Sequence, residues 1–168
     1  MTTLFLARHG ETVDNVNKIM QGQTQGELTE RGVQQARELC ETMRDEHIDA
    51  FVASDLKRSY DTCAIIAAPY GKTVVTTPLL RERDWGGFTG RYIPDLQDEV
   101  WPDDIESLDA LCNRALQFLE WLKKTFPQQR VLAVGHGIIN KAIQSVFYNK
   151  PMNQVLRMEN AEVRVLEV

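Results

Sequence analysis

Two short apolar runs constrain this chain most, because each leads directly into a histidine flanked by glycine. Leu4–Ala7 is followed by Arg8-His9-Gly10, and Val131–Val134 is followed by Gly135-His136-Gly137. Apolar runs of this length that are bounded by glycine are typical of buried strands. If both strands belong to one parallel sheet, their carboxyl ends share an edge, and the two histidines converge in one crevice.

The rest of the chain alternates between helical and strand-like patterns. We expect helices beginning after Thr29, over residues 56–68, from Ser107 to about residue 126 and over 138–147, and strands at 50–53, 73–77 and 163–168. Thr29 and Ser107 are expected N-caps, and Ser54-Asp55 is expected to cap the helix that follows it. This alternation predicts an α/β three-layer sandwich, with a mostly parallel central sheet and helices on both faces.

Two stretches do not follow this pattern. Residues 11–26 are polar and rich in Asn, Gln and Gly, so they are expected to form a loop or a frayed helix. Residues 79–106 mix charged and aromatic residues with glycine and proline, which predicts a short functional loop, or lid, beside the crevice. No repeat or linker is present, and residues 1–168 are expected to form a single domain.

Composition excludes several classes of protein. The chain is 43% hydrophobic and 26% charged, which is ordinary for a globular protein, and its net charge of −5 argues against nucleic-acid binding. No apolar run approaches membrane-spanning length, and the N-terminus does not resemble a signal peptide, so a cytoplasmic protein without a membrane partner is expected. The three cysteines form no Cys-x-x-Cys pair and are expected to be reduced thiols. The sequence leaves the oligomeric state open.

A cluster of cationic side chains is expected at the strand-end edge. Arg58 lies in the first turns of the helix after the second strand, and this helix begins at the same edge. Two arginines, Arg8 and Arg58, together with two histidines at a helix N-terminus would bind a phosphate. The alternative is that these are four independent polar side chains near loops, each satisfying only local hydrogen bonds.

The residues that other classes of phosphate-cleaving or phosphate-binding proteins require are absent from the sequence. No cysteine is followed by arginine six positions later, and neither a Gly-x-Ser-x-Gly elbow nor a Gly-x-x-x-x-Gly-Lys-Ser/Thr loop occurs. The three histidines are scattered, so no metal site is expected. If a phosphate ester is cleaved here, histidine is the remaining nucleophile, because imidazole is nucleophilic at physiological pH and phosphohistidine hydrolyses readily.

Four motifs occur in a fixed order from Arg8 to Gly137, and the pattern to which they belong runs from Thr3 to about Val165. They are Arg8-His9-Gly10-Glu11-Thr12 with Asn15, Ser54-x-x-x-Arg58 with Thr62, Leu80-Arg81-Glu82 before Gly86 and Gly90, and Gly135-His136-Gly137. Together they resemble the histidine phosphatase superfamily, in the branch of the cofactor-dependent phosphoglycerate mutases and related phosphatases. The resemblance implies a phosphoglycerate mutase-like fold.

The resemblance also implies a role for each matching residue. His9 would attack phosphorus and carry the phosphoryl group, while Arg8, Arg58 and His136 would bind the phosphate oxygens. Glu82 would protonate the leaving oxygen and then activate water. The implied substrate-binding positions are Asn15, Gln21, Gly22 and Gly137. This scheme requires neither a metal nor a cofactor.

The chain departs from the family pattern beside the expected site. Related phosphatases commonly read Gly-x-x-Asp-x-Pro-Leu-Thr where residues 22–29 lack the Asp and the Pro, and their Trp-Glu-Gly appears here as Phe88-Thr89-Gly90. The longer insertion and paired arginines of the mutases have no counterpart after Arg91, although Glu82-Arg83 does resemble the mutases.

We therefore expect a phosphomonoester hydrolase that acts on a small phosphorylated metabolite through a phosphohistidine at His9. The alternatives are mutase-type phosphoryl transfer, a phosphohistidine-protein phosphatase and a non-catalytic phosphate-binding domain. The physiological substrate is not predicted.

Overall fold

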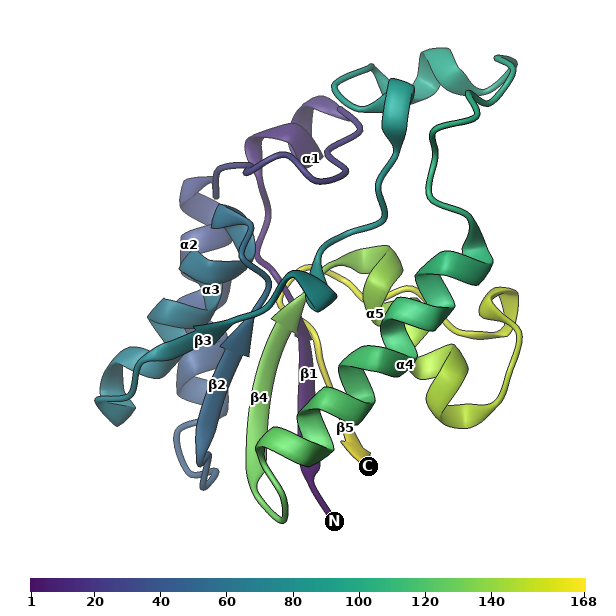
Figure 1. Cartoon of the computed structure of the whole chain (residues 1–168). Helices are drawn as coiled ribbons and strands as arrows, with labels where there is room; N and C mark the ends of the chain where they lie inside the picture. The colour runs from purple at the N-terminus through teal and green to yellow at the C-terminus, as the bar shows by residue number, and fades with distance from the viewer.

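A five-stranded sheet with the strand order β3-β2-β4-β1-β5 forms the centre of the molecule (Figure 1). The computed structural model describes all 168 residues. The strands are β1 (Thr3–Arg8), β2 (Ala50–Ala53), β3 (Val74–Thr76), β4 (Arg130–Gly135) and β5 (Val163–Glu167). The first four run parallel, and β5 pairs antiparallel with β1. The prediction of a mostly parallel sheet is confirmed.

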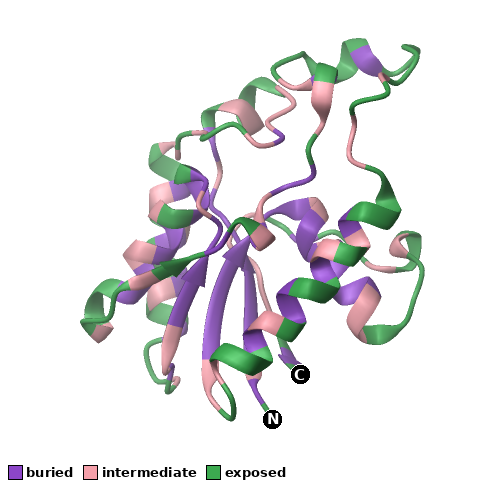
Figure 2. Ribbon diagram, in the orientation of Figure 1, coloured by how far each residue is buried: buried purple, intermediate pink, exposed green.

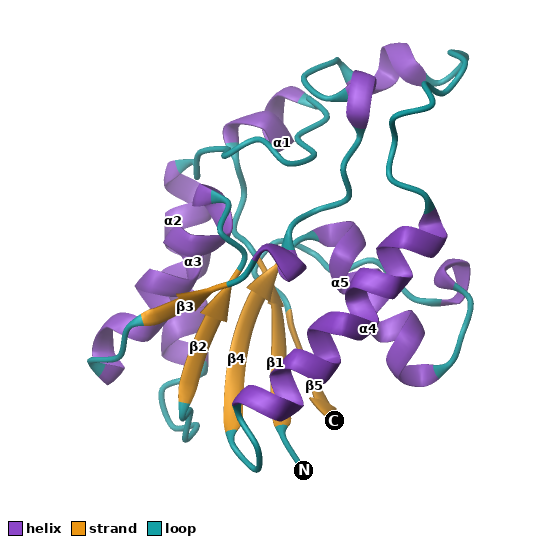
Figure 3. Ribbon diagram, in the orientation of Figure 1, coloured by secondary structure: helices purple, strands orange, loops and turns teal.

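Helices cover both faces of this sheet (Figure 3). The α-helices are α1 (Val13–Asn17), α2 (Glu30–Thr42), α3 (Lys57–Ala67), α4 (Leu108–Thr125) and α5 (Gly137–Tyr148). Leu4 and Leu6 of β1 pack in one apolar cluster with α4 and α5, whereas Phe5 and Ala7 pack in a second cluster with α2 and α3. Because successive strand residues point to opposite faces, a continuous apolar run fills both layers.

The burial pattern follows from these layers. The central strands are buried, and exposed residues gather on the outer faces of the helices and on the loops (Figure 2). None of the helices combines the length and the hydropathy that crossing a membrane requires.

The structure confirms the predicted N-caps of two helices and contradicts the predicted N-cap of a third. Thr29 accepts a hydrogen bond from the N–H of Gly32, and Ser107 accepts one from the N–H of Ala110. The expectation that Ser54-Asp55 caps α3 is wrong, because the N-cap is Leu56, which makes no side-chain cap bond. As described below, Ser54 instead contacts a histidine that lies far away in the sequence.

The 3₁₀ helices are short and lie in the connections between the main elements. They are η1 (Ala68–Tyr70), η2 (Pro78–Leu80), η3 (Gly86–Phe88), η4 (Ile93–Leu96) and η5 (Met152–Gln154). Residues 79–106, predicted to form a lid, rise beyond the carboxyl edge of the sheet (Figure 1). Backbone hydrogen bonds join this segment to the polar loop: the N–H of Gly90 donates to Met20 and that of Ile93 to Lys18, both at 2.8 Å.

Candidate active site

His9 follows β1 directly and is buried at the carboxyl edge of the sheet. Its Nδ1 atom lies 2.7 Å from the carbonyl oxygen of Gly10. A carbonyl oxygen only accepts hydrogen bonds, so Nδ1 carries the ring proton and Nε2 keeps its lone pair. Burial, and then the charges of Arg58 and Arg8, lower the pKa of His9 well below 6.5. The ring is therefore neutral at physiological pH, with Nε2 available as a nucleophile.

The turn after His9 packs tightly against the start of α2. A Cβ on Gly10 would lie 2.5 Å from the carbonyl oxygen of Gly32, and a Cβ on Gly32 would overlap the carbonyl oxygen of Glu11. Only glycine avoids both overlaps. The N–H of Gly10 also donates to Oγ1 of Thr62 in α3, at 3.1 Å. Helices α2 and α3 together therefore fix the backbone that carries the nucleophile.

The guanidinium groups of the two predicted arginines are held by backbone carbonyls. Arg8 donates from Nη1 to Met158 at 2.8 Å, and Arg58 donates from Nη2 to Gly22 at 2.8 Å and from Nη1 to Thr24. In both residues Nε is buried without a partner. Burial lowers the pKa of both groups, that of Arg58 to about 10, so both remain charged at neutral pH. Two buried N–H groups are thus available to an anion.

His136 is the N-cap of α5, and its ring centroid lies 5.1 Å from that of His9. Its Nε2 atom is 2.6 Å from Oγ of Ser54, which also accepts the N–H of Leu56. The Ser54 hydroxyl has no other acceptor, so it donates to Nε2, and the neutral ring carries its own proton on Nδ1. That atom is buried without a partner. Burial, followed by the charge of Arg58, lowers the pKa of His136 well below 6.5.

Glu82 lies at the N-terminus of α5. Its Oε2 accepts the N–H of Ile138 at 3.0 Å, and its Oε1 accepts those of Ile139 at 3.0 Å and Arg83 at 2.8 Å. The helix N-terminus was predicted to offer its free N–H groups to a phosphate, and this needs correction. The carboxylate of Glu82 already occupies most of that site, as an anion at a helix N-terminus does. Only the N–H of Gly137 is left without a partner in the chain.

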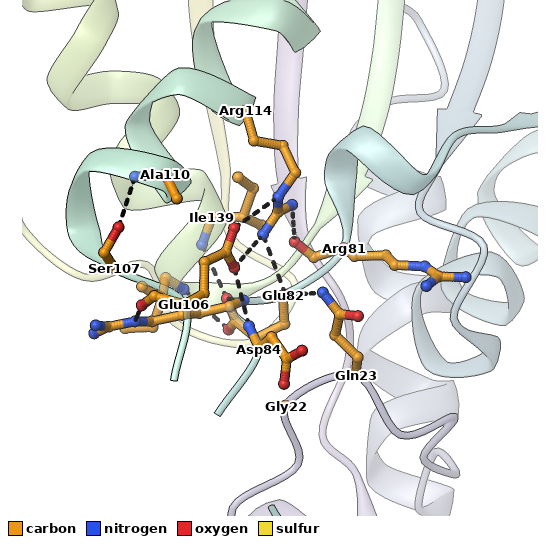
Figure 4. Close-up of polar contacts among 12 residues, drawn as sticks. Gly22, Gln23, Arg81, Glu82, Asp84, Glu106, Ser107, Ala110, Arg114 and Ile139 are labelled. Carbon is orange, nitrogen blue, oxygen red and sulfur yellow. Dashed lines mark hydrogen bonds and ion pairs between the residues drawn. The ribbon is translucent and has the colours of Figure 1, made fainter. Parts of the chain in front are cut away.

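A partly buried ion pair holds the segment that carries Glu82 (Figure 4). Arg114 of α4 donates from Nη2 to Glu106 at 2.8 Å and from Nη1 to the carbonyl oxygen of Arg81 at 2.6 Å. Gln23, from the polar loop, donates to the carbonyl oxygen of Glu82 at 3.2 Å. The position of Glu82 is thus set by contacts with α4, with α5 and with residues 22–29.

Asn15 and its neighbours form a further wall. Oδ1 of Asn15 accepts the N–H of Thr12 at 3.0 Å and Nδ2 of Asn160 at 3.4 Å. The side-chain Nδ2 group of Asn15 has no partner in the chain and is free to donate. Oε1 of Gln21 accepts the hydroxyl of Thr12 at 2.9 Å, and Gly22 adopts a positive φ of 52°. The hydrogen bonds that Arg58 donates to the carbonyl oxygens of Gly22 and Thr24 shape this loop, which lacks the Asp and the Pro of related phosphatases.

These groups surround a cavity of about 200 Å³. Its lining residues are Arg8, His9, Asn15, Ile19, Met20, Gln21, Gly22, Arg58, Glu82, Trp85, Ile93, Ile138 and Arg157. Seven of the nine predicted site residues are among them. His136 lies against the His9 ring and Gly137 lies beside Arg8, so the structure brings all nine into one region. No group of three or more His, Cys, Asp and Glu side chains is arranged to hold a metal ion.

Arg157 is a lining residue that the sequence did not single out. It lies between η5 and β5, outside the four motifs, and no local pattern marks it. Its place at the cavity follows from the topology: because β5 runs antiparallel, the residues that precede it return to the carboxyl edge of the other strands.

The fold and the buried histidine–arginine cluster define the class of protein. The chain belongs to the histidine phosphatase superfamily (branch 1), whose family model matches residues 4–168. The predicted resemblance and the predicted enzyme class are confirmed.

Some relatives are named phosphatases and others mutases. The chain is 34% identical over 179 residues to a probable phosphoglycerate mutase, GpmB, of an Enterobacter species, covering 97% of this chain and 83% of the relative. It is 33% identical over 166 residues to the uncharacterized phosphatase PhoE of Bacillus subtilis, covering 96% and 86%. Among solved structures it is similar to a mycobacterial glucosyl-3-phosphoglycerate phosphatase, with a TM-score of 0.87, 27% identity and coverage of 98% and 92%.

Proposed function

We propose that this protein hydrolyses small phosphomonoesters through a phosphohistidine formed on His9. One observation carries the proposal: a buried, neutral His9, whose Nε2 is unprotonated, lines the same cavity as Arg8 and Arg58. The Nε–H groups of both arginines are buried without partners. A phosphate monoester supplies both an electrophilic phosphorus for the imidazole and anionic oxygens for these donors.

In the first step, Nε2 of His9 attacks phosphorus and the bond to the ester oxygen breaks. Glu82 is the only carboxylic acid that lines the cavity; it takes up the proton of the bound phosphomonoester monoanion and gives this proton to the leaving oxygen. Arg8, Arg58 and His136 bind the other phosphate oxygens and stabilise the charge on the transferring group.

In the second step, water attacks the phosphohistidine. Glu82, now ionised, accepts a proton from this water while the P–N bond breaks. His9 leaves as the neutral imidazole, and inorganic phosphate is released. The proton on Glu82 leaves with the phosphate, which restores the carboxylate and the starting protonation state of the enzyme.

The surroundings of Arg83 favour a phosphatase over a mutase. Its guanidinium carbon lies 4.6 Å from the ring centroid of Trp85 and 5.5 Å from that of Trp101. Its Nε donates to the carbonyl oxygen of Glu106 at 2.8 Å, and the residue does not line the cavity. The mutase-like pair Glu82-Arg83 therefore offers the substrate only its first member. The phosphoenzyme would then lose its phosphoryl group to water.

Residues 1–168 are proposed to act as a single domain with a lid at 79–106. In support, both apolar clusters draw on the same strands β1, β2 and β4. A small phosphorylated substrate, a cytoplasmic location and the absence of nucleic-acid and membrane partners stay predictions from the sequence.

The test is hydrolysis of 4-nitrophenyl phosphate by the wild type, His9→Ala and His47→Ala. His47 is an exposed histidine bonded to Asp49, and it controls for loss of a ring elsewhere. We expect His9→Ala to lose at least about 10³-fold in kcat and to form no acid-labile phosphoenzyme. Near-wild-type hydrolysis by His9→Ala would refute the proposal.

The same experiment separates the alternatives. Rapid quenching with a labelled substrate shows whether the phosphoryl group on His9 passes to water or to added monophosphoglycerate, and transfer to the latter would indicate a mutase. Activity that disappears in a chelator would indicate a metal-dependent reaction. A purified wild type that binds phosphate but turns over no ester would indicate a binding domain.

A further inference from the structure

Arg157 places a third guanidinium group at the cavity, and this one is free. Arg8 and Arg58 are each held by backbone carbonyls. Arg157 is exposed, and its only hydrogen bond uses its carbonyl oxygen, which accepts from Arg164 at 3.4 Å. A cation that lines a cavity and has no partner in the chain is available to a ligand.

The guanidinium of Arg157 lies close to the phosphate-binding groups. A Cβ placed on Gly137 would be 3.4 Å from Nε of Arg157 and 3.5 Å from Nε of Arg8, so both guanidinium groups flank the same point. The charge of Arg157 also lowers the pKa of Arg8 and that of His9. A ligand whose phosphoryl group is in line with His9 therefore lies within reach of Arg157.

Neighbouring carboxylates leave this charge uncompensated. Glu82 accepts the backbone N–H groups at the start of α5, and Glu162 forms an ion pair with Arg164 at 2.7 Å. No ion pair joins Arg157 to these two groups or to Glu159. A phosphomonoester dianion already meets two guanidinium groups, so a third calls for an additional negative charge on the ligand.

We propose that Arg157 determines specificity by binding a carboxylate of the substrate, and that the preferred substrates are small phosphomonoesters with a carboxylate close to the phosphorylated hydroxyl. This inference rests on the proposed function. A single guanidinium matches the single charge of a carboxylate better than the greater charge of a second phosphate, and its two-pronged geometry fits a carboxylate. The cavity of about 200 Å³ accommodates a ligand with a short carbon skeleton.

The sharpest test compares two substrates that differ only in this group, O-phosphoserine and O-phosphoethanolamine. We expect the wild type to favour O-phosphoserine by at least 10-fold in kcat/KM. In Arg157→Gln this ratio should fall by about 10–100-fold, chiefly through a higher KM for O-phosphoserine, as expected for loss of a charge-assisted hydrogen bond. Arg157→Lys should give an intermediate ratio.

Arg37→Gln is the matched control, because Arg37 is exposed on α2 and forms no ion pair, and it should keep the wild-type ratio. Equal losses on both substrates in Arg157→Gln would assign Arg157 to the phosphoryl group, and an unchanged ratio would show no role; either result overturns the inference. These outcomes are distinct from failure of the proposed function, which would appear as full activity of His9→Ala on 4-nitrophenyl phosphate.

Discussion

Oγ of Ser54, just after β2, lies 2.6 Å from Nε2 of His136, just after β4. This bond directs the ring proton of His136 to Nδ1, where a phosphate oxygen can accept it. Ser54→Ala removes the restraint, and we expect kcat to fall by about 10-fold or more as the wrong tautomer becomes populated. Ser54 is thus a positioning residue.

Long-range ¹H–¹⁵N spectra of His136 provide the readout, because the tautomer should change in Ser54→Ala. Ser145→Ala is the matched control: Ser145 is also buried, but its hydroxyl donates to the carbonyl oxygen of Lys150. A wild-type tautomer in Ser54→Ala would contradict the assignment.

The two buried histidines should make stability depend on pH. In the folded protein, burial and neighbouring arginines lower the pKa of His9 and His136 well below 6.5, whereas in the unfolded chain they titrate near their ordinary value. Below pH 6.5 the unfolded chain therefore binds protons that the folded protein does not. The free energy of unfolding should fall as the pH drops, by up to about 1.4 kcal/mol per pH unit for each histidine.

Urea denaturation between pH 7.5 and 5 measures this dependence. His9→Asn and His136→Asn should each flatten it, and His47→Asn, which removes an exposed ring, should not. A slope that survives in the double variant of His9 and His136 would assign the effect to other groups.

Gly32 should tolerate no side chain. Alanine normally stabilises a helix interior by about 1 kcal/mol relative to glycine. Here its Cβ would overlap the carbonyl oxygen of Glu11, a backbone atom that cannot rotate away. Because such overpacking typically costs about 1–3 kcal/mol or more, we expect Gly32→Ala to lower the free energy of unfolding and to displace His9.

Gly87→Ala is the comparison for this variant, since a Cβ there would lie 3.4 Å from its nearest neighbour, and its φ is not positive. Denaturant melts of the two variants should separate clearly. Equal stabilities would show that the turn after His9 is more adaptable than its packing indicates.

Glu82 should matter most for poor leaving groups. In Glu82→Gln we expect kcat on alkyl phosphates to fall by about 10²–10⁴-fold, because an alkoxide requires a proton as it leaves. The loss on 4-nitrophenyl phosphate should be smaller, because nitrophenolate is a stable anion. The ratio between the two substrates is the measurement, since it is insensitive to any general disturbance of α5. Equal losses would remove Glu82 from the role of acid.

Much of this arrangement could be predicted because it depends on local patterns. Four-residue apolar runs bounded by glycine identify buried parallel strands, and parallel strands place their carboxyl ends together. That rule alone brings His9 and His136 into one place. The caps Thr29 and Ser107 are equally local, since each bonds to a residue three positions ahead.

The remaining features depend on contacts between distant segments. Ser54 was expected to cap its own helix but lies 82 positions from its histidine partner, and the carboxylate of Glu82 caps a helix that begins 55 residues later. Contacts between residues this far apart leave no periodic pattern in the sequence. Arg157 was missed for a related reason: its position depends on the direction of β5, which an alternating five-residue strand does not reveal.

The antiparallel course of β5 also brings the two ends of the chain together. Thr2 and Val168 exchange backbone hydrogen bonds of 3.0 and 2.9 Å, at the end of the sheet opposite the carboxyl ends of the parallel strands (Figure 1). A short peptide linker could therefore join the termini into a circular chain. Either terminus could also be attached to a solid support while the active site stays exposed to solution. The termini and the active site therefore lie at opposite ends of the molecule, so a modification of the termini leaves the site accessible.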